Sequence, residues 1–361
     1  MLAKKDLQKL VAYAGGTPVL TVYVSTDLAR EPKESVTLAV RNCLRDLGSA
    51  LPQREADRVQ HFLAYEYDWQ ARGMAVFSAG ESLWRTIPLP APVPTRAYYA
   101  DLPHLRELTD MIDRFGQHVV ALVDSANLRL FTVESGIVHS ETEAVGEQLR
   151  RHRQGGYAAA RFQRHEENLA LHNLKQAAED IRSYCEQSEC RRLMLAGAAE
   201  IVAQLKDLMP VALREKVIGE FPADIESTPS EILGRSMAIL DEITAKEEHD
   251  LVTSVVTAAG KGGAGVIGLA DTLYALQQGR VRQLLVDEGY TASGYRCTAC
   301  AYVAAELSPT CPFCGAGDLQ TVPDAVNRAI HRTIQTGAEV NIVRGSAELR
   351  IAGGIAALLR Y

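Results

Sequence analysis

The sequence predicts a mixed α/β (α+β) fold of three domains, in which sheets are flanked by helices and a zinc knuckle is inserted in the third domain. Short apolar runs typical of strands alternate with longer stretches of helical periodicity. Four closely spaced cysteines then interrupt this alternation in the last third of the chain. A length of 361 residues is enough for two or three domains. The expected domains are residues 1–112, 113–248 and 249–361, with the knuckle at 295–316.

The first domain is expected to contain a sheet and several helices. Residues 18–24 are mostly apolar or β-branched, which favours a strand. The run from Pro88 to Pro94 is too rich in proline for regular structure. The expected elements are strands at 74–78 and 83–87, besides 18–24, and helices at 35–49, 53–71 and 104–115.

The second and third domains also alternate strands with helices. The pattern predicts a long helix over 159–187 and places the knuckle between a strand and its crossover helix in a β-α-β unit. Gly260 to Gly265 is expected to be a structural loop, because it lacks the Gly-Lys-Ser/Thr ending of a phosphate-binding loop. The other expected elements are strands at 118–124, 128–133, 136–139, 192–196, 281–286, 339–343 and 357–361, and helices at 269–278 and 323–336.

Composition and charge exclude several classes of protein. No apolar run reaches the ~18 to 20 residues that a membrane-spanning helix needs. The N-terminal residues contain no apolar segment typical of a secretion signal. The sequence therefore predicts a cytoplasmic protein. A net charge of -7 is atypical of nucleic-acid-binding proteins, so any contact with RNA must come from a local basic patch.

Four of the seven cysteines form a doubled Cys-x-x-Cys pattern: Cys297, Cys300, Cys311 and Cys314. Each Cys-x-x-Cys turn directs two thiolates at one ion, so two turns supply a closed tetrahedral site. Because four thiolates leave no open coordination position, the expected cofactor is a structural Zn²⁺. The alternatives are two unrelated pairs or a redox dithiol. The other three cysteines, at 43, 185 and 190, are expected to be buried thiols.

The most basic segment runs from Arg150 to His165 and contains no acidic residue. Gly155 and Gly156 at its centre permit backbone conformations closed to other residues. Guanidinium groups on both sides of such a tip are suited to phosphates and to unstacked RNA bases. The alternative is a solvated basic loop that precedes a helix. The candidate RNA-binding residues are Arg150, Arg151, Arg153, Arg161 and Arg164.

Three segments, in order, resemble archaeal and eukaryotic peptide-chain release factors and Pelota, including a bacterial, Balon-like branch. Gly155-Gly156-Tyr157 through Phe162 resembles the Gly-Gly-Gln-x-x-x-Arg-Phe motif of their central domain. Val266 to Val286 resembles the opening of their third domain. The ending from Gly337 resembles their C-terminus, and archaeal members carry paired Cys-x-x-Cys turns at the same place.

The resemblance implies a tRNA-shaped, ribosome-associated factor that occupies the A site in ribosome rescue or hibernation. The loop at Gly155 and Gly156 would reach toward the peptidyl-transferase centre, with the five arginines on ribosomal RNA. The third domain would contact a translational GTPase.

Two departures from the family limit what the resemblance implies. Tyr157 occupies the position of the catalytic glutamine, so no catalytic residue is carried over with the motif. Residues 1–112 lack the Asn-Ile-Lys-Ser motif, so stop-codon reading is not expected. Two alternatives remain open: a peptidyl-tRNA hydrolase in which Tyr157 or a backbone amide positions water, and a non-ribosomal protein-interaction module.

Overall fold

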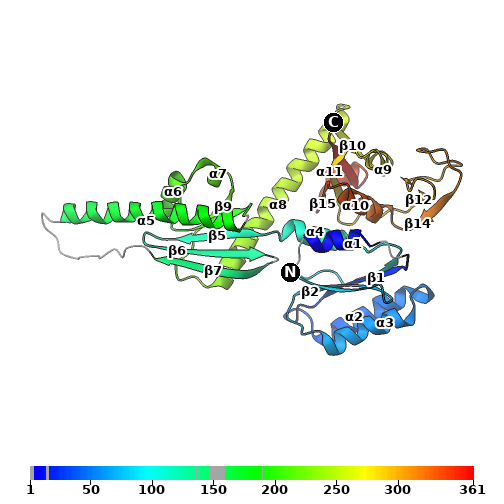
Figure 1. Ribbon diagram of the computed structural model, residues 1–361, viewed down its shortest axis with the longest axis horizontal. Helices are drawn as coiled ribbons and strands as arrows, with labels where there is room; N and C mark the ends of the chain where they lie inside the picture. Colours follow the sequence, from blue (N-terminus) through cyan, green and yellow to red (C-terminus); the bar gives the residue numbers. More distant parts are fainter. Residues whose placement is uncertain (1–3, 14–15, 135, 146–158, 189) are drawn as a thin grey trace. The chain divides into compact units, whose positions relative to one another are not determined.

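The computed structural model describes residues 4–13, 16–134, 136–145, 159–188 and 190–361. The chain forms two compact units, and each is described separately below. Unit 1 comprises Met1–Arg114 and Thr244–Tyr361, and unit 2 comprises Phe115–Ile243. Both contain sheets covered by helices, so the predicted mixed α/β class is confirmed (Figure 1). Within the described residues, no helix is long and apolar enough to cross a membrane.

The N-terminal part of unit 1 is built on an antiparallel sheet of four strands in the order β3-β2-β1-β4. Helices α2 and α3 lie side by side over one face of this sheet (Figure 1). Val36 and Val40 of α2 and Val59 of α3 pack there against Leu20 and Val22 of β1. The elements are α1 (Lys4–Val11), β1 (Val19–Ser25), α2 (Lys33–Asp46), α3 (Gln53–His61), β2 (Gly73–Ala79), β3 (Leu83–Leu89), β4 (Arg96–Ala100) and α4 (Arg106–Arg114), with short helical turns at η1 (Gly48–Ala50) and η2 (Phe62–Glu66).

Two sequence predictions in this part need correction. The helix expected at 53–71 ends in the π-helical turn η2 at Glu66, and the chain then becomes extended at Tyr67. The run that was expected to lack regular structure begins inside β3, which contains Pro88. A proline is tolerated there because β3 is an edge strand, where an amide can be missing from the ladder.

The C-terminal part of unit 1 contains a second sheet of four strands, in the order β10-β16-β11-β15. Strand β11 pairs in parallel with β15, and α10 is the crossover between them, so the predicted β-α-β unit is confirmed. Val252 and Val255 of α8 pack against Leu285 of β11 and Leu349 of α11. The elements are α8 (Pro229–Gly260), β10 (Gly265–Ile267), α9 (Leu269–Gln277), β11 (Val281–Asp287), α10 (Ala325–Gln335), β15 (Glu339–Val343), α11 (Ala347–Ile351) and β16 (Ile355–Leu359).

Helix α8 runs without a break from Pro229 to Gly260, so the domain boundary expected between residues 248 and 249 falls inside it. The glycines that follow α8 form a tight structural loop. Gly262 has a φ of +65°, and a Cβ on Gly265 would come within 2.5 Å of the Val255 carbonyl oxygen. Such backbone conformations and close approaches require glycine.

The segment from residue 101 to residue 114 holds the two parts of unit 1 together. Arg328 of α10 forms an ion pair with Asp101, and Arg344, just after β15, forms one with the buried carboxylate of Asp110. Helix α1 also packs against α10. The N-terminal sheet and the β11 sheet are therefore joined by contacts between residues more than 220 positions apart in the sequence.

Unit 2 is a sheet of five strands in the order β7-β6-β5-β8-β9, covered by helices on both faces. Leu174 and Ile181 of α5 pack on one face, and Ile232 and Leu240 of α8 pack on the other. The helix expected at 159–187 is confirmed, and the strand expected at 136–139 is longer than predicted. The elements are β5 (His118–Val123), β6 (Asn127–Glu134), β7 (Ile137–Val145), α5 (Ala159–Gln187), β8 (Leu193–Gly197), α6 (Ala199–Leu208), α7 (Val211–Arg214) and β9 (Val217–Phe221).

Candidate functional site

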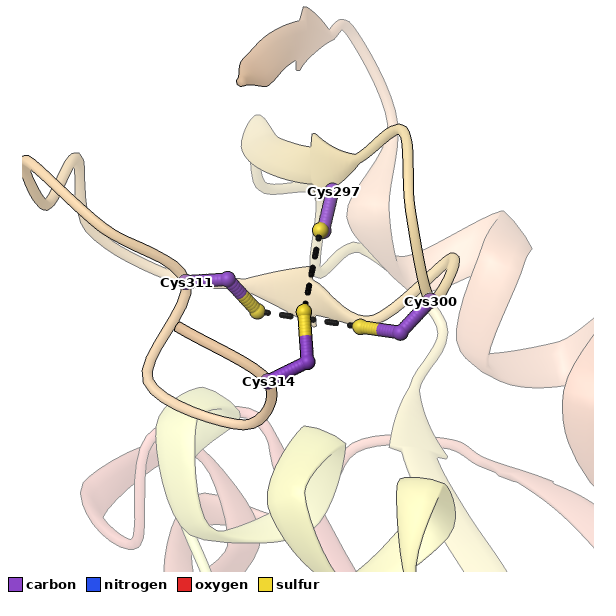
Figure 2. Close-up of side chains that lie close together, drawn as sticks. All are labelled: Cys297, Cys300, Cys311 and Cys314. Carbon is purple, nitrogen blue, oxygen red and sulfur yellow. Dashed lines mark hydrogen bonds between the residues drawn. The ribbon is translucent and has the colours of Figure 1, made fainter. Parts of the chain in front are cut away.

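The four cysteines of the doubled motif come together in a small module between β11 and α10. The module is a sheet of three strands, β13-β12-β14, in which β12 pairs antiparallel with both neighbours. Cys297 ends β12, Cys300 follows in the next turn, and Cys311 and Cys314 lie in the loop that leads to β14. Figure 2 shows the four side chains converging on one point. The strands are β12 (Gly294–Cys297), β13 (Val303–Ala304) and β14 (Leu319–Val322).

The four sulfur atoms lie close enough together to bind one metal ion. The Sγ atoms of Cys297 and Cys314 lie 3.6 Å apart, and those of Cys300 and Cys311 lie 3.7 Å apart (Figure 2). All four lie within 4.8 Å of one another. A zinc–sulfur bond of about 2.3 Å gives a tetrahedral sulfur–sulfur edge of about 3.8 Å, whereas a disulfide bond measures about 2.05 Å. The cluster can therefore hold one metal ion, and its cysteines are free thiols.

The two Cys-x-x-Cys turns have matching backbone hydrogen bonds. The Ala301 amide donates to the Cys297 carbonyl at 3.0 Å, and the Gly315 amide donates to the Cys311 carbonyl at 2.9 Å. The residue after each second cysteine adopts a left-handed conformation, with φ +61° at Ala301 and +79° at Gly315. This conformation strains an alanine but not a glycine. Both turns thus place their cysteine pairs in the same local geometry.

One cysteine of the cluster favours its thiolate form, whereas burial raises the pKa of Cys300 to about 12. Amide hydrogen bonds from Cys300, and next from Ala299, lower the pKa of Cys297 to about 7. Backbone amides that point at a sulfur stabilise its thiolate form, which is the form that binds metal. Cys297 and Cys311 are buried, while Cys314 is exposed. Four thiolates this close together repel one another unless a divalent cation lies between them.

An aromatic trio attaches the module to α9. Tyr302 of the module stacks on Phe313 with ring centroids 5.9 Å apart, and Tyr274 of α9 makes T-shaped contacts with both rings at centroid distances of 6.3 and 6.2 Å. The Gln277 side-chain amide also donates to the Cys300 carbonyl at 3.2 Å. Sequence reasoning missed these residues, although an aromatic residue inside a Cys-x-x-Cys turn is a visible indication of a docking contact.

The predicted RNA-binding loop lies almost wholly outside the described residues. Arg150, Arg151 and Arg153 fall in that gap, as do Gly155, Gly156 and Tyr157. Arg161 and Arg164 lie on α5, but their side chains are not described. Of the other cysteines, Cys185 and Cys190 are buried as expected, while Cys43 is only half-buried. The predicted roles of the loop residues stay predictions.

A comparison with protein families identifies the central part of the chain. Residues 103–240 match the family described as "Bacterial archaeo-eukaryotic release factor family 10". This match is a similarity of the central part of the chain to the release factor superfamily. The matched region includes the whole basic segment from Arg150 to His165. No curated protein matches the chain significantly.

Solved structures of the superfamily also match the chain over most of its length. The archaeal translation termination factor aRF1 shares 15% identity over 99% of this chain and 98% of its own, with a TM-score of 0.26. Archaeoglobus fulgidus Pelota shares 15% over 80% and 79%, with a TM-score of 0.35. A ribosome-bound archaeal Pelota with ABCE1 shares 13% over 99% and 94%, with a TM-score of 0.43.

Proposed function

We propose that this chain belongs to the release factor and Pelota superfamily and is a cytoplasmic, ribosome-associated factor that occupies the A site during ribosome rescue or hibernation. The observation that carries the proposal is the family match at residues 103–240, because it contains the acid-free basic segment and the Gly-Gly tip. In this proposal the domains expected at 113–248 and 249–361 contact ribosomal RNA and a translational GTPase, respectively.

The domain expected at 1–112 has no Asn-Ile-Lys-Ser motif, so the proposed role does not include stop-codon reading.

The basic segment would provide the contact with ribosomal RNA. Its arginines carry fixed positive charges that bind phosphates in pairs of hydrogen bonds and stack on exposed bases. Acidic residues are absent from 150–165 in a chain whose net charge is -7, so the positive potential of this segment is local. The candidate residues are Arg150, Arg151, Arg153, Arg161 and Arg164.

The metal in the four-cysteine cluster would be Zn²⁺ in a structural role. The sulfur-sulfur distances of 3.6 and 3.7 Å support a tetrahedral ion of this size. Thiolate ligands favour zinc over magnesium or calcium, which prefer oxygen. A closed site with four protein ligands leaves no position for water, so its task is to hold the module in shape. The third domain that contains this module is the part proposed to contact a translational GTPase.

Hydrolysis of peptidyl-tRNA is not part of the proposed function. The glutamine that release factors place at the tip of the motif is Tyr157 here. A phenol ring is larger than a carboxamide. Its single hydroxyl donates and accepts at one oxygen atom, whereas a carboxamide donates from nitrogen and accepts at a separate oxygen. Release of peptide from loaded ribosomes by the purified chain, lost in Gly156→Val, would replace this proposal with the hydrolase alternative.

Salt-dependent co-sedimentation with ribosomes tests the proposal. Each lost arginine–phosphate contact reduces the slope of log affinity against log salt by about one. The triple variant Arg150→Glu, Arg151→Glu, Arg153→Glu should therefore bind more weakly and with a slope smaller by about two to three. The matched control is Arg191→Glu with Arg214→Glu, two exposed arginines elsewhere in unit 2, which should bind like the wild type. No ribosome binding at low salt, or no effect of the triple variant, would contradict the proposal.

A further inference from the structure

Two half-exposed aromatic rings form a pair at the surface where the three-stranded module meets α9. Tyr274 of α9 and Phe313 of the second Cys-x-x-Cys turn are each 43% exposed, and their ring centroids lie 6.2 Å apart. Tyr302 lies beneath them and is only 5% exposed. Tyr302 therefore supplies the buried contact between module and helix. The pair above it keeps apolar surface in water, which is unfavourable unless a partner covers it.

The three-stranded module and helix α9 carry more acidic than basic side chains. In the segment from 294 to 322, Arg296 is the one basic residue, against Glu306 and Asp318. Asp271 lies on α9 three positions before Tyr274, so it faces the same side of the helix, and it is exposed. The four thiolates retain a net negative charge of about two when a divalent ion binds them. Such a surface repels the phosphates of RNA and attracts cationic groups.

We propose that Tyr274 and Phe313 form a docking site for a protein segment that presents an arginine or lysine next to an apolar side chain. The cation would lie over a ring face within about 6 Å of its centroid, where the electrons of the ring attract it. The exposed carboxylate of Asp271, one helical turn before Tyr274, would add electrostatic steering. Aromatic residues and arginines are also the side chains that contribute most to binding energy at protein interfaces.

This site is separate from the proposed ribosomal RNA contact. It uses residues of α9 and of the metal module, whereas the arginines of the proposed RNA contact lie between 150 and 164. A chain that fails to bind ribosomes can still bind a basic partner peptide at Tyr274 and Phe313. A chain that fails to bind this peptide can still bind ribosomes. The two proposals can therefore fail independently.

Binding of short labelled peptides to the zinc-loaded full-length chain tests the inference. The first probe is a peptide of alternating arginine and leucine, the second replaces every arginine with glutamate, and the third is an oligo-uridine RNA. Fluorescence anisotropy should show binding of the basic peptide, with far weaker binding of the acidic peptide and of the RNA. Equal binding of the acidic peptide, or tighter binding of the RNA, would overturn the proposal.

Variants locate the binding site. Tyr274→Ser and Phe313→Ser should each weaken the basic peptide about tenfold, while Tyr274→Phe, which keeps the ring, should bind like the wild type. The control is Ile351→Ser, which removes an apolar side chain that is 89% exposed on α11. Asp271→Lys leaves the rings in place and should weaken binding most at low salt. Zinc content, measured for each variant, separates lost docking from a lost module. Unchanged affinity in Tyr274→Ser and Asp271→Lys with zinc retained would overturn the inference.

Discussion

Asn327 on α10 accepts a buried hydrogen bond from the backbone amide of Leu105, 222 positions earlier in the sequence, at 3.1 Å. The same side chain donates from Nδ2 to the Pro103 carbonyl at 2.9 Å, and His331 Nε2 lies 2.7 Å from that carbonyl. One amide side chain thus satisfies two backbone groups of a segment that would otherwise have unpaired polar atoms in a buried contact. Polar side chains of α10 therefore fix how residues 103–105 pack in unit 1.

Replacing Asn327 with leucine should destabilise unit 1 strongly. The substitution keeps the volume but leaves the Leu105 amide without its partner and removes one donor from the Pro103 carbonyl. The expected loss in free energy of unfolding is about 2–4 kcal/mol, since each unsatisfied buried group costs about 1–3 kcal/mol. Urea unfolding followed by circular dichroism measures it. Gln70→Ala, at an exposed loop position, is the control and should stay within about 0.5 kcal/mol of the wild type. A wild-type midpoint in Asn327→Leu would contradict this interpretation.

Acid should destabilise unit 1 through its two buried histidines. Burial lowers the pKa of His104 to about 3 and that of His331 to about 4. In the unfolded chain both histidines take up a proton near pH 6.5, so between about pH 6.5 and about pH 4 the unfolded state binds more protons. Stability is therefore highest above pH 6.5 and falls as the pH drops through this window. The slope is about 1.4 kcal/mol per pH unit for each histidine.

The variant His331→Gln isolates one of these groups. Burial raises the pKa of Glu107 and Asp110, which acts in the opposite direction, but the wild type and the variant share these carboxyls. The difference in slope between the two proteins should therefore be about 1.4 kcal/mol per pH unit between pH 6 and about pH 5. Denaturant midpoints across that range measure it. Identical slopes would show that His331 titrates normally in the folded chain.

Loss of the metal should unfold the three-stranded module. Strands β12, β13 and β14 contain few core residues, so their stability depends on the bound ion, as in small metal-dependent domains. Cys311→Ser should reduce bound zinc from one ion per chain to none and lower the thermal midpoint, and a chelator should do the same to the wild type. Cys43→Ser, at a half-buried cysteine outside the cluster, is the control and should keep its zinc. Elemental analysis of the purified proteins gives the ratio. Zinc retained in Cys311→Ser would contradict a four-thiolate site.

Two glycine-to-alanine substitutions should have opposite effects on stability. Gly315 has a φ of +79°, and an added methyl group would meet no heavy atom within 4 Å, so alanine there should cost about 1 kcal/mol from backbone strain alone. Gly234 on α8 also has open space around it but lies within a helix. Alanine at that position should stabilise the chain by up to about 1 kcal/mol. Unfolding free energies compare the two. A gain in Gly315→Ala would show that the knuckle turn does not require a left-handed residue.

Periodicity and motif spacing predicted the local elements well and the long-range contacts poorly. Helix α5 and strand β15 have the predicted bounds, because each has a clear pattern bounded by a turn. Strand β4 (Arg96–Ala100) was missed because it is short and follows a proline-rich run. It pairs with β1, whose residues are some 75 positions earlier in the sequence. Pairing of this kind depends on tertiary packing that a local pattern does not contain.

In the metal site, too, the local features were predicted and the long-range contacts were not. The spacing of the four cysteines was enough to predict the cluster, since each turn is a local structure. Phe313 in the second turn indicates a docking contact, but the sequence does not show that its partner is Tyr274, because that depends on where α9 packs. The buried hydrogen bonds of Asn327 were also missed. Its partners are backbone atoms, and no side-chain pattern in the sequence indicates such a contact.

Competition with tRNA for the ribosomal A site is the sharpest test of the proposed function. Purified chain is mixed with ribosomes whose A site is either empty or filled with tRNA, and the bound fraction is measured by sedimentation at low salt. We expect binding to ribosomes with an empty A site and loss of that binding when tRNA fills it. Equal binding to both kinds of ribosome, or binding to neither, would contradict the proposed function.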